Sequence, residues 1–145
     1  MISLLPDAVR MANLTSEFYS HLDERNYEAA IRSFAVDGVW FRRGAPLIGH
    51  GAMREAMRAR PADFHTRHIV SNVRVHHESA DAGCVVFYLT GHPHVGEIPE
   101  GEYVPLPPAH IVATYRDSMR KVDGEWVIAE KRLLTTGFKD QLKLP

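Results

Sequence analysis

The stretch His110–Leu134, HIVATYRDSMRKVDGEWVIAEKRLL, decides the fold class. On both sides of Val122-Asp123-Gly124, apolar residues alternate with polar ones or form continuous runs, which is typical of two strands joined by a hairpin turn. The same pattern extends back through the second half of the chain. It predicts strands at Thr66–Val70, Val73–His77, Cys84–Thr90, His110–Arg120 and Trp126–Leu134.

The first half of the chain shows helical periodicity instead. A shared apolar face with steps of three and four residues predicts a first helix that begins at Pro6-Asp7 and ends near Asp23. The residues on this face are Met11, Leu14, Phe18 and Leu22. Helices followed by a run of strands, without alternation of the two, indicate an α+β fold rather than a doubly wound nucleotide-binding fold.

Two further helices are expected between the first helix and the strands. Asn26 is a suitable cap for a short second helix, which the turn Asp37-Gly38 closes before an extended segment from Val39. A loop from Gly44 to Gly51 then leads to a third amphipathic segment, Ala52–Arg60, which ends at a proline. Between two of the strands, the proline-rich segment Gly91–Pro108 is predicted to be a long loop, either a lid or binding element, or a plain surface or subunit-contact loop.

The bulk composition is that of an ordinary globular protein. The 145 residues are 45% hydrophobic and 24% charged, which suits a single domain over residues 1–145 with a substantial core. The formal net charge is −1, so nothing favours nucleic acid as a partner. Small molecules or other proteins are the expected partners.

Cysteine usage and segment hydrophobicity bear on the cellular compartment. Cys84 is the lone cysteine and lies in an apolar run, so we expect a buried, reduced thiol. The N-terminal MISLLPDAVR has no basic region or long apolar stretch of the kind a signal peptide requires, and no segment is long enough to span a membrane. These features predict a cytoplasmic protein that does not bind membranes.

Several enzyme classes are disfavoured by the motifs. The sequence has no phosphate-binding loop, dinucleotide-binding glycine pattern, nucleophile elbow or paired-cysteine zinc motif. Among the nine histidines, His76 and His77 are adjacent on a strand and point to opposite faces, while His92 and His94 flank a proline at a strand end. Neither pair has the geometry of a metal site, so no metal is expected.

His68 is the histidine whose surroundings favour chemistry. Strand alternation places Thr66, His68 and Val70 on one face of Thr66–Val70. If that face lines a pocket, His68 is a candidate general base, provided that a carboxylate fixes its tautomer and holds the imidazolium formed. The alternative is a core histidine bonded to the backbone.

Motifs along most of the chain resemble the SnoaL-like family of the nuclear transport factor 2-like superfamily. This family includes polyketide cyclases and is similar to scytalone dehydratase and to hexachlorocyclohexane dehydrochlorinase. No single motif is specific, and their order and spacing carry the resemblance. The motifs are residues 22–27 (LDERNY), residues 34–40 (FAVDGVW), Gly49 with the helix after it, residues 66–72 (TRHIVSN) and residues 123–128 (DGEWVI).

The resemblance implies a cone-shaped, strongly curved mixed or antiparallel sheet, with three helices from the N-terminal half enclosing an apolar cavity. It also implies a proton-abstracting dyad at Asp23 and His68, a cavity tryptophan at Trp40, and a cavity cation at Lys131 or, one residue later, Arg132. Asp23 has an alternative role as a helix-end residue.

The remaining positions assigned to substrate binding complete the expected cavity wall, and some depart from the family pattern. The assigned residues are Trp40, Tyr19, Thr66, Phe18, Val70 and Tyr88. Measured against scytalone dehydratase, the catalytic aspartate would fall nearer Ser20 than Asp23. Lys131 keeps the charge of the family arginine but lacks its planar fork, and a basic residue of the dehydrochlorinase is replaced near Phe18.

Two functions therefore remain open at the level of sequence. One is a cofactor-free lyase or isomerase, of the dehydratase, cyclase or dehydrohalogenase type, which acts on an apolar cyclic small molecule. The other is a non-catalytic binding or interaction domain, including an accessory subunit similar to the small subunit of ring-hydroxylating oxygenases. Because family members bury the open face of the sheet by pairing, we expect a homodimer or homotrimer.

Overall fold

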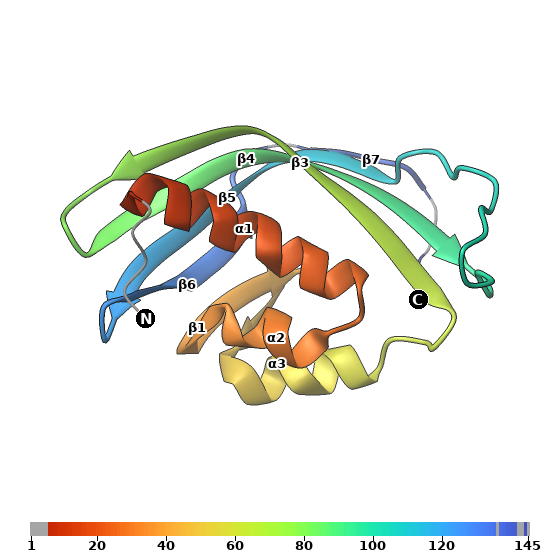
Figure 1. The fold of residues 1–145 in the computed structure, drawn as a ribbon, viewed down its shortest axis with the longest axis horizontal. Coiled ribbons are helices and arrows are strands. Elements are labelled where there is room, and N and C mark those ends of the chain that lie inside the picture. Colours follow the sequence, from red (N-terminus) through yellow and green to blue (C-terminus); the bar gives the residue numbers. More distant parts are fainter. Residues whose placement is uncertain (1–5, 136, 142–143, 145) are drawn as a thin grey trace.

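The fold is an α+β arrangement in which a curved sheet wraps around helices (Figure 1). The structure, a computed structural model, describes residues 6–135, 137–141 and 144; the N-terminal residues 1–5, part of the segment predicted not to be a signal peptide, lie outside this range. Within the described residues the elements are α1 (Asp7–Asp23), α2 (Tyr27–Arg32), β1 (Phe34–Arg42), β2 (Ala45–Ile48), α3 (Gly49–Arg58), β3 (Phe64–His77), β4 (Ala82–Val95), β5 (Ile111–Val122), β6 (Glu125–Leu133) and β7 (Phe138–Lys139).

The strands of the described chain form one seven-stranded sheet with the order β2-β1-β6-β5-β4-β3, and β7 pairs with β5. The pairing of β1 with β6 is parallel, whereas the other pairings are antiparallel, so the sheet is mixed. The long strands β3 and β4 arch over α1, while α2 and α3 lie below it (Figure 1). The predicted α+β class and curved sheet are confirmed, and the sheet does not close on itself.

Helix α1 is fixed at both ends. At its start, Pro6 precedes the first turn and Asp7 accepts hydrogen bonds from the indole Nε1 of Trp126 (3.0 Å) and the Nζ of Lys121 (2.9 Å). After its end, Arg25 has a positive φ of 64°, and its guanidinium donates to the carbonyl of Phe64 at 3.0 Å. The last turn of α1 is therefore held against the beginning of β3.

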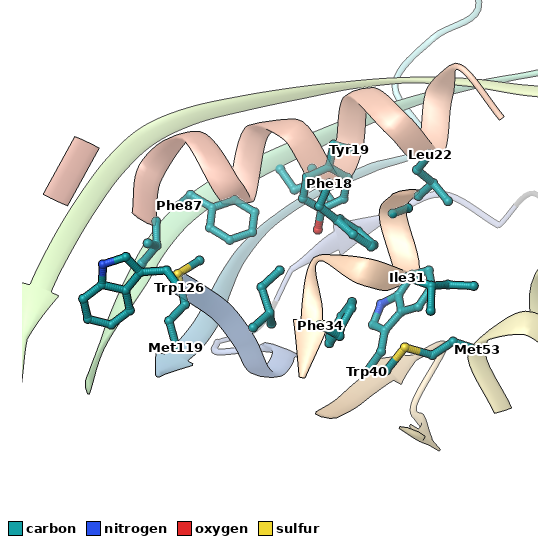
Figure 2. Packing of buried hydrophobic residues seen from close by; sticks show 14 of the residues in the cluster. Phe18, Tyr19, Leu22, Ile31, Phe34, Trp40, Met53, Phe87, Met119 and Trp126 are labelled. Atoms are coloured by element: carbon teal, nitrogen blue, oxygen red, sulfur yellow. The ribbon is translucent and has the colours of Figure 1, made fainter. Parts of the chain in front are cut away.

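The core lies between α1 and the concave face of the sheet. Phe18 sits at its centre, with edge-on ring contacts to Tyr19, Phe34 and Trp40 at centroid distances of 5.0, 5.5 and 5.2 Å (Figure 2). These side chains are buried, and burial of such apolar area is the main favourable term in folding. The core fixes how α1 faces the sheet.

Three predictions about the first half were wrong in detail. Asp37-Gly38 is not a turn but lies within β1, where a Cβ on Gly38 would come within 3.0 Å of the Ile128 carbonyl oxygen. The glycine there allows close approach of β1 to β6. The expected loop after β1 contains the short strand β2, and α3 begins at Gly49 rather than Ala52.

In the second half the strands are longer than predicted. The two strands expected at Thr66–Val70 and Val73–His77 form one strand, β3, with an irregularity between Ser71 and Arg74. Strand β4 continues to Val95, so the first part of the proposed Gly91–Pro108 loop is strand and the irregular part begins afterwards. Cross-strand pairing overrides local loop signals such as the proline in this segment.

Cys84 is buried, as predicted. Among the helices of the described chain, none combines the length and the apolar character that crossing a bilayer requires.

Candidate active site

A pocket of about 660 Å³ lies beside α1, between the end of β1 and the middle of the sheet. This volume is in the range of small-molecule sites. Its wall differs from the expected enclosed apolar cavity, because the pocket is partly open to solvent and carries several charged side chains. The described lining residues are Tyr19, Leu22, Trp40, Phe41, Arg42, Arg43, Met57, Arg60, Phe64, Thr66, His68, Leu89, His110, Ile111, Tyr115, Lys139, Asp140, Gln141 and Leu144.

His68 lines this pocket and is bonded to Asp23 through both its ring and its backbone. The distance between Nδ1 of His68 and Oδ1 of Asp23 is 2.6 Å, and the backbone N–H of His68 donates to Oδ2 at 2.7 Å. The hydroxyl of Thr66 donates to Oδ1 of Asp23 at 2.7 Å. Three donors from one strand therefore hold the carboxylate at the end of α1.

These contacts determine the protonation pattern of the pair. Burial works to raise the pKa of Asp23, but hydrogen bonds from His68 and Thr66 and the attraction to His68 outweigh it, so the pKa falls below 3.8. Asp23 is thus ionised at neutral pH and accepts hydrogen bonds only. The Nδ1 of His68 must then carry a proton in this contact, so the neutral tautomer that fits it has Nε2 as the proton acceptor.

Aromatic side chains predicted to bind substrate surround the imidazole. Tyr19 and Trp40 line the pocket, and the ring centroid of Tyr19 lies 5.0 Å from that of His68. Burial, together with the nearby Asp117, raises the pKa of Tyr19 well above 10.0. The phenol is therefore a neutral donor at physiological pH.

The predicted cavity cation lies elsewhere. The Lys131 side chain is fully buried, and its Nζ lies 2.7 and 2.8 Å from the two carboxylate oxygens of Asp117. Thr15 donates to the same carboxylate at 2.7 Å, and the Phe18 ring centroid lies 4.5 Å from Nζ. Lys131 is not among the pocket-lining residues, because this ion pair holds it between α1 and the sheet.

Four further predicted residues also lie outside the pocket wall. Arg132 is half exposed and bonds Glu130 at 3.3 Å. Phe18 belongs to the core, Val70 packs against that core from the edge, and Tyr88 is 41% exposed on the opposite face of β4. Side-chain alternation in β4 explains the position of Tyr88, since its neighbour Leu89 points into the pocket.

A family model of the SnoaL-like domain matches residues 4–132 of the chain. The protein belongs to the SnoaL-like family. The recognition drawn from the sequence motifs is thereby confirmed, and it covers the part of the chain that supplies Asp23, Thr66 and His68.

Solved structures share the fold of this SnoaL-like domain. A Nostoc punctiforme protein of unknown function with a cystatin-like fold has a TM-score of 0.73 at 22% identity, with 92% of this chain and 93% of that chain covered. A candidate scytalone dehydratase from Novosphingobium aromaticivorans has a TM-score of 0.70 at 17% identity, covering 93% and 88%. A ketosteroid isomerase-like protein from Erwinia carotovora atroseptica has a TM-score of 0.66 at 16% identity, covering 86% and 92%.

No curated protein matches the chain significantly in sequence. The family match shows a SnoaL-like domain, and the similar structures show that the chain shares their fold.

Other residues of the SnoaL-like pocket were not predicted from the sequence. Arg42 follows the buried part of β1, and Arg60 follows the last turn of α3. A pair of arginines at the end of a buried strand, Arg42-Arg43, was an available signal. Arg60 offered none, because its place in the pocket depends on the packing of α3 against β1.

A second histidine–aspartate pair was also missed. His110 and Asp140 line the pocket, and Nδ1 of His110 is bonded to Oδ1 of Asp140. The backbone N–H of His110 donates to the carbonyl of Gly91 at 2.7 Å, and Gly91 is the strand partner of His68. A Cβ on Gly91 would come within 2.9 Å of Cγ2 of Ile111, so a larger residue here would crowd that pocket-lining side chain.

The remaining histidine pairs are separate from the pocket wall. His76 and His77 are exposed near the end of β3, and Nδ1 of His92 is 2.9 Å from the carbonyl oxygen of Pro107. Within residues 6–135, 137–141 and 144, no group of three or more His, Cys, Asp or Glu side chains is arranged to hold a metal ion.

Proposed function

We propose that this protein is a lyase or isomerase that uses its own side chains as acid and base on a cyclic small molecule. The observation that carries the proposal is the 2.6 Å contact between Nδ1 of His68 and the Asp23 carboxylate, with His68 on the pocket wall. A neutral imidazole oriented in this way is suited to accept a proton from carbon.

In the proposed reaction, Nε2 of His68 takes a proton from an activated carbon of the substrate. The electron pair of the broken C–H bond forms a new double bond. In an elimination, the leaving group departs from the neighbouring carbon with its bonding electron pair. In an isomerisation, an enolate forms and the His68 imidazolium returns the proton to another carbon. Asp23 stays ionised and stabilises the imidazolium through Nδ1. Positioned acid–base catalysis contributes about a hundred- to ten-thousand-fold, so the substrate must be activated already or carry a good leaving group.

Stabilisation of a developing oxyanion falls to groups other than Lys131, which is held by Asp117. Tyr19 and Tyr115 line the pocket, and burial raises the pKa of both phenols. Each therefore offers an O–H donor at neutral pH. In a partly dry site, such preorganised donors stabilise charge that develops in the transition state.

We expect a cyclic substrate because part of the pocket wall is aromatic and aliphatic. Leu22, Trp40, Met57, Phe64 and Leu89 line the pocket together with His68. Flat or puckered rings bury apolar area against such side chains, which favours binding by about 25 cal/mol per Å².

The test is a panel of cyclic ketones and alcohols in deuterated water. Binding is scored by thermal stabilisation, since a ligand that binds the native state raises its melting temperature. Chemistry is scored by NMR, as deuterium incorporation at carbon or as loss of water. His68→Ala should keep the thermal shift and lose the chemistry, while His76→Ala, an exposed histidine on the same strand, should keep both.

If ligands stabilise the wild-type protein but it never exchanges their protons or converts them, the proposal that it is an enzyme is contradicted. That result would instead support the non-catalytic binding domain.

A further inference from the structure

Two arginines on the wall of the pocket lack the acidic partner that half-buried arginines normally have. Arg42 and Arg60 both line the pocket that contains His68. Within the described residues, neither guanidinium group makes an ion pair or a hydrogen bond, and both contact aromatic rings instead. The Cζ of Arg60 lies 4.8 Å from the ring centroid of Phe64 and 5.3 Å from that of Tyr27, and the Cζ of Arg42 lies 5.8 Å from that of Trp40.

The two guanidinium charges of this arginine pair, Arg42 and Arg60, are costly in free energy when the pocket holds no anion. Burial, with the neighbouring Arg43 and Arg60, lowers the pKa of Arg42 to about 10. Burial also lowers the pKa of Arg60, and its Nε and Nη1 are buried without a partner among the described residues. Desolvated, unpaired charges cost free energy, and an anion bound beside them offsets that cost.

The other charged side chains on the described pocket wall do not cancel the positive charge of the arginine pair. Lys139 and Arg43 add cationic character, and Asp140 is the acidic lining residue, bonded to His110. Asp23 attracts Arg60 through space, but its carboxylate oxygens already accept hydrogen bonds from His68 and Thr66.

The chemistry of the arginine pair selects the kind of anion. A guanidinium presents its N–H donors as a planar fork that matches the two oxygens of a carboxylate, and stacking on aromatic rings holds that plane in place. The aromatic contacts of Arg60 on Phe64 and Tyr27 supply this support. The pocket, at about 660 Å³, has room for a ring system together with its carboxylate.

We propose that Arg42 and Arg60 form the subsite for a carboxylate of the ligand, so that the substrate is a cyclic carboxylic acid whose ring lies toward His68. That the bound acid is a substrate rests on the proposed function. Binding of the carboxylate by the two arginines does not depend on catalysis. It separates the charged end of the ligand from the carbon that reacts. It also replaces the cation role that the sequence assigned to Lys131.

The test compares matched acids and amides by isothermal titration calorimetry. The probes are cyclohexene-1-carboxylate, benzoate and 2-naphthoate, each beside its neutral carboxamide of nearly identical shape. The proteins are wild type, Arg42→Gln, Arg60→Gln and Arg58→Gln. Arg58 is the matched control, because it is exposed on the last turn of α3, two residues before Arg60, and does not line the pocket.

At least one carboxylate should bind the wild type more tightly than its amide. Arg42→Gln and Arg60→Gln should each weaken that carboxylate by about ten- to a hundredfold, because charge-assisted hydrogen bonds are lost, and should leave the amide nearly unchanged. Arg58→Gln should behave as the wild type. If no acid of the panel outbinds its amide, or if Arg58→Gln weakens the acid as much as the other two variants, the subsite is refuted.

A fourth variant separates this proposal from the enzymatic one. His68→Gln should bind the carboxylate about as well as the wild type, even if turnover is absent, because the anion is held by the arginine pair. Loss of carboxylate binding in His68→Gln, with unchanged binding in the arginine variants, would overturn the proposal. If the melting curve shows that Arg60→Gln does not fold, the proposal is still tested by Arg42→Gln and by the comparison of acid and amide binding to the wild type.

Discussion

Oδ1 of Asp23 at the end of α1 lies 2.6 Å from Nδ1 of His68 in β3 and also accepts the hydroxyl hydrogen of Thr66 at 2.7 Å. The guanidinium of Arg25, two residues beyond Asp23, ties the same end of the helix to the Phe64 carbonyl at the start of that strand. The carboxylate is thus fixed by the backbone frame as well as by its own hydrogen bonds. Such support by surrounding groups is what preorganises a general base.

Replacement of Asp23 by asparagine should lower kcat/KM by about a hundred- to ten-thousand-fold. The amide cannot stabilise an imidazolium, and its NH₂ group can present a donor to Nδ1 and so favour the wrong imidazole tautomer. The measurement is the initial rate of deuterium exchange or elimination on the substrate found with the wild type. Glu24→Gln changes the adjacent, exposed carboxylate and should leave the rate unaltered; equal rates for Asp23→Asn and wild type would exclude a role for Asp23 in the chemistry.

Acid should remove the stabilising contribution of Asp23. Although burial opposes it, hydrogen bonding by His68 and Thr66 lowers the native pKa of this carboxyl below its unfolded value. The contribution is therefore complete above the unfolded-state pKa of about 3.9 and is lost as the pH falls through the lowered native pKa. Urea unfolding of wild type and Asp23→Asn from neutral pH downward should show a difference in free energy of unfolding that shrinks below about pH 4. A difference that is constant across this range would contradict the prediction.

The buried pair of Lys131 and Asp117 should behave as a structural element. Lys131→Met leaves the Asp117 carboxylate without its counterion in the core and should cost about 3–5 kcal/mol in free energy of unfolding. Adding Asp117→Leu to Lys131→Met should recover much of this loss, because the uncompensated charge is removed. Chemical denaturation of the three proteins provides the measurement. A stable Lys131→Met protein with lost substrate binding would point back to a role for this lysine in the pocket.

The outer face of the sheet carries an apolar patch that we expect to mediate self-association. Ile69, Tyr88, Val112 and Phe138 lie on four neighbouring strands, face away from the pocket and are 53%, 41%, 38% and 78% exposed. Contiguous apolar surface of this kind marks interaction sites. Light scattering should give two or three times the chain mass of 16.4 kDa.

Ile69→Lys should shift that mass toward the single chain, because a charge is costly in an apolar interface. Val36→Lys, at an exposed position on β1 outside the patch, should not. A wild-type protein that scatters as one chain at all concentrations would refute the expected homodimer or homotrimer.

Helix and strand types were predictable because they follow from patterns that are local in the chain. The helical spacing of the apolar residues Met11, Phe18 and Leu22 indicates α1 whatever the helix packs against. Strand alternation places Thr66 on the same face as His68, and this needs no knowledge of the partner strand. The element boundaries were less accurate, since Gly38 within β1 and Gly91 within β4 have loop-like signals that pairing with neighbouring strands overrides.

By itself the sequence determined the class of fold, the family and, through the family motifs, the candidacy of Asp23 and His68. Tertiary structure alone decided which charges meet. It buries Lys131 against Asp117, brings Arg42 and Arg60 from separate elements to one wall, and joins His110 to Asp140. The physical reason is that hydrophobic periodicity is encoded residue by residue. The meeting of two side chains depends instead on strand register, sheet curvature and helix packing, which are settled by the whole core at once.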